Sequence, residues 1–233
     1  MTKKTVCIFP GQGAQYVGMG KDFFQSFSVA KETFQEADER LSFNLSKLIF
    51  EGPSEELTLT KNSQAAIYVV SMVISRVIND QLPSFTPSVC AGLSLGEYTA
   101  LTVAGKLSFA DGLDLVRARG LYMHEASVNH PGTMAVVLGL ELEKIKVVIK
   151  DHVFIANLNC PGQVVISGTI DGIAKASELL KDAGAKRVIL LDVSGAFHSG
   201  LMNDAKLKLE EKLQMVQFLE SDTEIVMNVC LLY

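Results

Sequence analysis

The sequence predicts an α/β fold with a parallel-sheet core and a smaller inserted subdomain. Two apolar strands, Thr5–Phe9 and Ser88–Ala91, each run into a glycine-containing turn, as strands of parallel sheets do at their carboxyl ends. From Thr133 onward the pattern changes to short strands that alternate with helices. The chain has 233 residues, of which 48% are hydrophobic, and this is enough to bury a sizeable core.

Two strands and a set of helices are predicted for the first half of the chain. Thr5–Phe9 is a continuous apolar run ended by Pro-Gly, which is typical of a strand buried on both faces. Ser108 and Asp111 form a capping box that predicts the start of a further helix. Apolar residues spaced three and four apart, together with the flanking glycines and prolines, predict helices at 29–41, 63–82 and 97–104.

The second half is predicted to contain the insert, in the order β-α-β-β-α-β of a ferredoxin-like subdomain. We expect the core to comprise residues 1–130 and 193–233 and the insert to comprise residues 131–192. A helix at 201–219 and a strand at 224–229 follow the insert. The expected elements of the insert are 134–138, 141–150, 153–158, 163–167, 171–183 and 187–191.

Charge and hydropathy exclude several classes of protein. The net charge of -5 argues against a nucleic-acid partner. The longest apolar run, Ala65–Ile74, is far shorter than the roughly 20 residues of a membrane span, and no secretory segment precedes Pro10. These features predict a cytoplasmic protein.

The four cysteines, Cys7, Cys90, Cys160 and Cys230, lie far apart and form no C-x-x-C pair. In a reducing compartment, isolated cysteines of this kind usually behave as small buried hydrophobic residues. We therefore expect neither a disulfide nor a zinc site.

The segment Gly92-Leu-Ser94-Leu-Gly96 matches G-x-S-x-G between a predicted strand and a predicted helix. In this context the two glycines allow a tight turn that exposes the serine oxygen at the edge of the sheet. The pattern predicts Ser94 as a nucleophile, with the N–H of Leu95 near a developing oxyanion. The alternative is a purely structural turn.

A serine nucleophile requires a base, and the chain contains four histidines. His130 and His152 are flanked by loop or charged residues and are predicted to be on the surface, while His124 falls on a helix. His198 lies in a glycine-flanked loop after a strand, which is where α/β proteins place catalytic groups. His198 is therefore the candidate base, and the alternative is a loop histidine without a catalytic role.

The loop Pro10-Gly-Gln-Gly13 follows the first strand, and the N–H of Gln12 is a candidate second oxyanion donor. Its G-x-G lacks the third glycine and the distant acidic residue of a dinucleotide site. We therefore predict no nucleotide cofactor here.

Five ordered motifs carry a resemblance to a known family. They are Phe9-Pro-Gly-Gln-Gly-Ala-Gln15, Gly92-Leu-Ser-Leu-Gly-Glu-Tyr98, Arg117-Ala-Arg-Gly120, Asn159-Cys-Pro-Gly-Gln-Val-Val-Ile-Ser-Gly168 and Gly195-Ala-Phe-His-Ser-Gly-Leu-Met202. Together they resemble the malonyl-CoA:acyl carrier protein transacylases (FabD) of fatty acid biosynthesis. The resemblance covers the whole chain and implies a hydrolase-like parallel-sheet core.

The resemblance implies a role for each of several residues. The nucleophile falls on Ser94 and the base on His198. The residues that would bind the substrate or the oxyanion are Gln12, Gln64, Leu95, Arg119 and Gln163. Arg119 would pair with the free malonyl carboxylate, since a guanidinium can hold a carboxylate with two hydrogen bonds, while Arg117 should face elsewhere on the helix.

The resemblance also implies the reaction and its partners. Malonyl would pass from malonyl-CoA to Ser94 and then to the phosphopantetheine thiol of acyl carrier protein, without ATP, metal or redox cofactor. Lys186 and Arg187 form the best adjacent basic pair for docking an acidic carrier protein, although they could equally be ordinary solvated charges. The complete protein is expected to be a monomer, and the preference for malonyl over methylmalonyl stays open.

This sequence departs from the family at its end, because the family continues beyond the position of Tyr233 with a segment that orients the base. We therefore expect an incompletely covered core, low stability and slow turnover. Two alternatives stay open. One is a serine esterase or thioesterase of α/β-hydrolase type, and the other is a catalytically silent fragment that only binds carrier protein or CoA.

Overall fold

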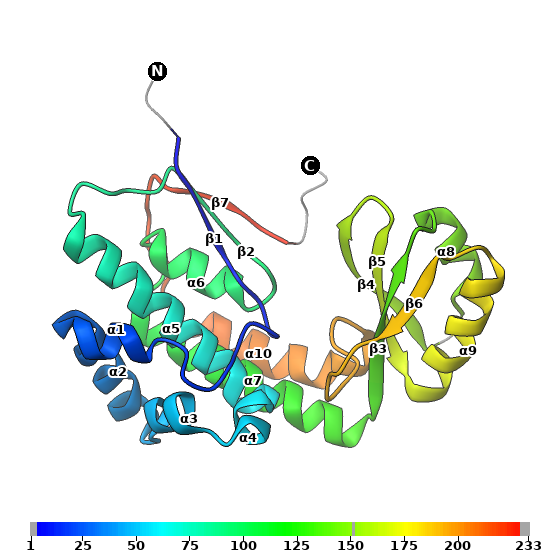
Figure 1. Cartoon of the computed structure of the whole chain (residues 1–233), viewed down its shortest axis with the longest axis horizontal. Helices are drawn as coiled ribbons and strands as arrows, with labels where there is room; N and C mark the ends of the chain where they lie inside the picture. The colour runs from blue at the N-terminus through cyan, green and yellow to red at the C-terminus, as the bar shows by residue number, and fades with distance from the viewer. Residues whose placement is uncertain (1–3, 151, 229–233) are drawn as a thin grey trace. The chain divides into compact units, whose positions relative to one another are not determined.

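The computed structural model describes residues 4–150 and 152–228, which form two compact units (Figure 1). The first unit contains the described residues up to Leu121 and those from Glu211 onward, and the second is Tyr122–Glu210. Val229 and Cys230 lie outside the described residues. None of the described helices is long and apolar enough to span a membrane.

The first unit contains a three-stranded parallel sheet, so the predicted parallel core is confirmed. Its strands are β1 (Val6–Phe9), β2 (Val89–Gly92) and β7 (Glu224–Val226), in the order β1-β2-β7. Cys7 pairs with Cys90 in the register, and Cys90 pairs with Ile225. Because the strands are parallel, the segments that follow β1, β2 and β7 leave the sheet at the same edge.

Helix α6 (Gly96–Val103) packs on one face of this sheet, against Phe9 and Cys90. The prediction that β1 is buried on both faces is wrong. Side chains alternate along a strand, and in the described residues Val6 and Ile8 remain 55% and 76% exposed on the face that α6 does not cover. A continuous apolar run specifies a strand but not how many of its faces are covered.

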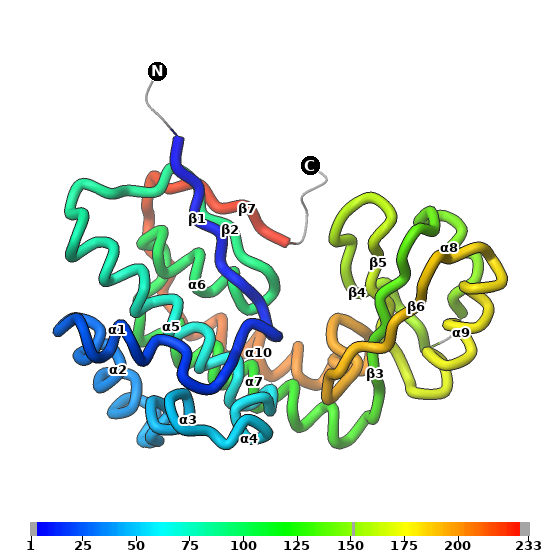
Figure 2. Tube along the Cα trace, viewed as in Figure 1, coloured from blue at the N-terminus to red at the C-terminus, as the bar shows by residue number. Residues whose placement is uncertain are grey.

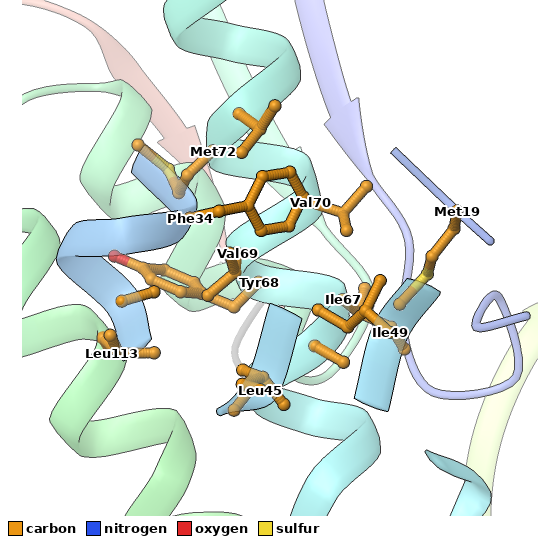
Figure 3. Packing of buried hydrophobic residues seen from close by; sticks show 14 of the residues in the cluster. Met19, Phe34, Leu45, Ile49, Ile67, Tyr68, Val69, Val70, Met72 and Leu113 are labelled. Carbon is orange, nitrogen blue, oxygen red and sulfur yellow. The ribbon is translucent and has the colours of Figure 1, made fainter. Parts of the chain in front are cut away.

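A helical layer continues from α6 and forms the main apolar core of the first unit. Helix α5 (Thr60–Gln81) packs against both α6 and α2 (Ser28–Leu41), and both α2 and α5 fall where the sequence predicted helices. Figure 3 shows Phe34 of α2 among Ile67, Tyr68, Val69 and Val70 of α5. Three shorter helices complete this layer: α1 (Lys21–Ser26), α3 (Leu45–Glu51) and α4 (Ser54–Thr58).

Helix α7 (Phe109–Asn129) begins with the predicted capping box. The N–H of Asp111 donates to Ser108 Oγ at 3.0 Å, and that hydroxyl donates to Asp111 Oδ2 at 2.6 Å. Two glycines of α7 face α5. A Cβ on Gly120 would lie 2.7 Å from the carbonyl oxygen of Thr60, and a Cβ on Gly112 would overlap the Tyr68 hydroxyl. The absence of both side chains lets α7 approach α5 closely, which positions the residues beside Gly120.

The second unit contains a four-stranded antiparallel sheet in the order β4-β5-β3-β6, traced in Figure 2. Helices α8 and α9 pack with it around a separate apolar cluster that includes Ile145, Ile166 and Leu180. In chain order the elements are β3 (Gly132–Leu138), α8 (Leu142–Val148), β4 (Val153–Cys160), β5 (Gln163–Thr169), α9 (Ile170–Asp182) and β6 (Arg187–Leu190).

Two further predictions are wrong in detail. The helix predicted at 201–219 is a 3-10 turn, Gly200–Met202, followed by α10 (Asn203–Gln214). Beyond Gln214 the N–H groups of Met215 and Val216 donate to carbonyls three residues back, and the N–H of Leu219 donates to Lys106 O. Cys160 is exposed rather than buried, because it ends β4 at the β-turn before Gln163.

The turn between β2 and α6 is sterically constrained from both sides. Ser94 has φ 54°, in the left-handed region that ordinary side chains avoid. A Cβ on Gly92 would overlap the backbone of Gly96, and a Cβ on Gly96 would lie 2.5 Å from Phe9 O. The predicted strand, tight turn and helix are therefore present, and the turn holds the Ser94 backbone in a costly conformation.

Replacing Ser94 tests this strain. Ser94→Gly and Ser94→Ala both remove the hydroxyl, but only alanine keeps the Cβ that makes a positive φ unfavourable. We expect Ser94→Gly to be more stable than Ser94→Ala by about 1 kcal/mol in free energy of unfolding, measured in urea. The matched pair Ser177→Gly and Ser177→Ala within α9 should show the reverse order, because alanine is favoured in helices. Equal stabilities of the two Ser94 variants would contradict the strain.

Candidate active site

Arg119 contacts the hydroxyl of Ser94 directly. Its Nη2 donates to Ser94 Oγ at 2.8 Å, and its Nη1 donates to Gln64 Oε1 at 2.6 Å. Gln64 has no exposed surface, so its amide is a fixed partner for the guanidinium. The structure thus brings together three residues that the sequence analysis singled out, from the β2–α6 turn, α5 and α7.

The environment of Arg119 is largely desolvated. Burial lowers the pKa of Arg119, while nearby Tyr98 and Glu97 act in the opposite direction. The Tyr98 ring lies 6.0 Å from the guanidinium carbon. Because arginine stays protonated in proteins, this site places a fixed positive charge beside the Ser94 hydroxyl. Such a charge can bind a carboxylate, but it cannot accept a proton from serine.

The loop after β1 lies against the same turn. A Cβ on Gly11 would be 2.8 Å from Leu93 O, so glycine is needed for this approach. The next residue, Gln12, donates through Nε2 to Thr60 Oγ1 at 3.1 Å. Leu95 is the N-cap of α6 and is fully buried. Gln12 therefore follows the glycine that packs on the Ser94 turn, and Leu95 lies within that turn. Their role as oxyanion donors stays a prediction.

Arg117 faces away from Ser94, two residues before Arg119. Its Nη1 donates to Lys61 O and, at 3.1 Å, to Asn62 Oδ1. Burial lowers the pKa of Arg117, and its guanidinium lies 5.5 Å from the Phe43 ring. The prediction that Arg117 points elsewhere is confirmed.

Sequence reasoning missed one residue that contacts the turn, Asn228, which lies just after β7. Asn228 Oδ1 accepts from the N–H of Ser94 at 2.6 Å, and Asn228 Nδ2 donates to Gly92 O at 2.6 Å. The Asn228 N–H donates to Glu97 Oε1 at 2.5 Å, and burial raises the pKa of Glu97. Glu97 stands within the G-x-S-x-G motif region, but no local pattern marks Asn228.

The remaining candidate residues belong to the second unit. His198 lies in the loop after β6, also with a positive φ of 57°. Gln163 begins β5 and accepts from Asn159 Nδ2 at 3.2 Å, and Lys186 and Arg187 are exposed at the start of β6. His130 and His152 are exposed as predicted.

The chain matches the acyl transferase domain family over residues 6–226. It is 47% identical to the malonyl CoA-acyl carrier protein transacylase of Bacillus subtilis (strain 168), over 97% of this chain and 73% of that protein. It is 40% identical to the protein of the same name from Escherichia coli (strain K12), over 95% and 73% of the two chains.

Solved structures agree with the sequence relatives. One is a malonyl-transacylase in complex with its type II PKS acyl-carrier protein, at TM-score 0.92 and 39% identity over 98% of this chain and 75% of that chain. Another is the acyl carrier protein S-malonyltransferase of Vibrio cholerae O1 biovar eltor str. N16961, at TM-score 0.91 and 39% identity over 98% and 76%. With the motif order and the Ser94 turn, these matches show that the chain belongs to the acyl transferase family of malonyl CoA-acyl carrier protein transacylases.

Proposed function

We propose that this chain transfers a malonyl group from malonyl-CoA to the phosphopantetheine thiol of acyl carrier protein through a malonyl-Ser94 intermediate. The observation that carries the proposal is the 2.8 Å hydrogen bond from Arg119 to Ser94 Oγ. A guanidinium at this distance suits a substrate with a free carboxylate next to the acyl group that reacts. The names of the relatives point to the same substrates.

In the first half-reaction, Ser94 Oγ attacks the thioester carbonyl of malonyl-CoA while His198 takes the hydroxyl proton. The carbonyl oxygen gains the negative charge, and the N–H groups of Leu95 and Gln12 stabilise it. The C–S bond then breaks, and the CoA sulfur leaves with the proton that His198 carries. A malonyl ester on Ser94 and free CoA are the products.

The second half-reaction reverses these steps with another thiol. The phosphopantetheine thiol gives its proton to His198 and attacks the malonyl ester, and Ser94 regains its proton when the C–O bond breaks. One thioester replaces another, so the exchange requires no ATP and no redox chemistry. Exclusion of water from the ester favours transfer over hydrolysis.

Arg119 is proposed to select the acyl group. In the described structure its two terminal nitrogens donate to Gln64 and Ser94, and the malonyl carboxylate would take over such donors. An acetyl group offers no charge to the guanidinium, so it gains nothing from this buried cation. Gln64 would hold the guanidinium in place, and Gln163 would contact the thioester part of the substrate.

We further propose that residues 131–192 form a ferredoxin-like insert that docks the carrier protein. The β-α-β-β-α-β order and the sheet order β4-β5-β3-β6 support this assignment. Lys186, just before strand β6, and Arg187, its first residue, are exposed and would attract an acidic partner.

Exposure of the chain to malonyl-CoA tests the proposed intermediate. We expect intact-mass analysis to detect one malonyl group, and peptide mapping to assign it to Ser94, because Ser94 occupies the constrained turn. Ser94→Ala should remove the label. Addition of carrier protein should discharge it onto the phosphopantetheine thiol, whereas a thioesterase would release malonate equally fast without carrier protein. A malonyl group on Ser194 or Ser199, or no label at all, would contradict the proposal.

Arg119→Ala tests the selection of malonyl. The charge-assisted hydrogen bonds that it removes are worth about 3 kcal/mol, so malonyl transfer should fall about a hundredfold while acetyl transfer falls much less. Arg117→Ala is the matched control, because Arg117 donates to Lys61 and Asn62 rather than to Ser94. It should leave the ratio of malonyl to acetyl rates unchanged. Equal losses for both acyl groups in Arg119→Ala would make Arg119 a structural residue.

A further inference from the structure

One amide side chain links the start of the Ser94 turn to Ser94 itself. The Asn228 amide oxygen accepts from the N–H of Ser94, and its amide nitrogen donates to the carbonyl of Gly92, both at 2.6 Å. An amide group alone among uncharged side chains presents an acceptor and a donor side by side. These two bonds fix the direction of the amide and bridge the last residue of β2 to the residue with positive φ.

A second anchor holds the backbone of Asn228 itself. Its N–H donates to Glu97 Oε1 at 2.5 Å, and Glu97 lies in the first turn of α6. The three bonds therefore connect the end of β7 with the strand, the turn and the helix of the G-x-S-x-G motif. Since parallel strands deliver their carboxyl ends to one edge, the pairing of β7 with β2 places Asn228 beside this turn.

We propose that Asn228 is a positioning residue that holds Ser94 in its strained conformation and so keeps the Ser94 hydroxyl in line for attack on the thioester. The inference rests on the proposed role of Ser94 as nucleophile. Asn228 acts through the backbone of Ser94 and Gly92, and no contact with substrate is assigned to it.

Loss of the Asn228 amide should lower the rate of Ser94 acylation rather than the free energy of unfolding. The residue is exposed, and hydrogen bonds at exposed positions add little to the free energy of unfolding, because water replaces them. A serine at φ 54° gains energy by relaxing toward ordinary φ values once its N–H partner is lost. Even a small displacement of a nucleophile lowers the rate of the chemical step more than it weakens substrate binding.

The experiment compares Asn228→Leu with the matched control Asn44→Leu. Leucine keeps the number and branching of the side-chain heavy atoms of asparagine and removes both polar atoms. Asn44 is the N-cap of α3, where its Oδ1 accepts from the N–H of Lys47 at 3.1 Å. Both variants therefore lose a hydrogen bond that a backbone N–H donates to a side-chain amide oxygen, but only one of them loses it at Ser94. The Asn228→Asp variant keeps an acceptor for the Ser94 N–H but loses the donor to Gly92 O.

Two readouts are taken from the full chain. The first is hydrogen exchange of the Ser94 amide, resolved by fragmentation in the mass spectrometer. The second is the single-turnover rate of Ser94 acylation at increasing malonyl-CoA concentrations. For Asn228→Leu we expect the Ser94 amide to exchange at least about tenfold faster than in the parent. The maximal acylation rate should fall about tenfold or more, while the half-saturating concentration of malonyl-CoA should stay within about twofold of the parent value. Asn228→Asp should restore part of the protection and part of the rate, because the Ser94 N–H keeps its acceptor while Gly92 O loses its donor. Asn44→Leu should change neither.

The two readouts separate failure of the Asn228 inference from failure of the proposed function. An unchanged exchange rate of the Ser94 amide in Asn228→Leu overturns the inference. A loss of acylation rate that Asn44→Leu shares overturns it as well, and so does a loss that appears only as a higher half-saturating concentration of malonyl-CoA. If the parent chain is never acylated, the proposed function fails. The exchange of the Ser94 amide still supports or overturns the contact of Asn228 with the turn in that case.

Discussion

The steric fit of the turn between β2 and α6 is the constraint on which the site depends. Gly92 and Gly96 are packed so closely against each other and against Phe9 that no side chain fits at either position. Ser94 lies between them at φ 54°, which L-residues adopt only when the surroundings enforce it. The turn therefore fixes the serine, and neighbouring elements are arranged around it: the loop at Gly11, the side chain of Asn228 and the start of α6.

The close packing of α7 on α5 supplies the second part of the site. Because Gly120 has no side chain, the helix lies against Thr60, and the preceding Arg119 reaches both Gln64 and Ser94. Within the part of the chain that the structure describes, the guanidinium is therefore held by packing and by a buried amide rather than by a carboxylate. A substrate carboxylate is the natural partner for such a cation, and this links the packing of two helices to the proposed choice of malonyl.

Local sequence patterns predicted the turn, but they could not predict contacts between residues far apart in the chain. Gly92, Ser94 and Gly96 form a contiguous motif, and the periodicity of α2 and α5 is strong over many residues, so these elements were predictable. Asn228 lies 134 residues from Ser94 and belongs to no local pattern, so only the pairing of β7 with β2 reveals it. The burial of β1 was mispredicted for a similar reason, since apolar Val6 and Ile8 cannot indicate whether a helix covers their face. The turn that exposes Cys160 likewise depends on the pairing of β4 with β5.

A graded series of glycine substitutions tests most directly whether this steric fit activates Ser94. The measurement is the rate at which a small fluorophosphonate labels Ser94, with folding checked by circular dichroism. A Cβ would lie 2.8 Å from Leu93 O at Gly11, 2.5 Å from Phe9 O at Gly96 and within the backbone of Gly96 at Gly92. The account predicts that labelling falls in that order for Gly11→Ala, Gly96→Ala and Gly92→Ala. Gly184→Ala, where φ is 101° and no atom lies within 4 Å of the added Cβ, should lower stability alone. Labelling of a folded Gly96→Ala variant at the parent rate would contradict the claim that this steric fit activates Ser94. The claim would also be contradicted if the labelling rates of all four variants simply followed their stabilities.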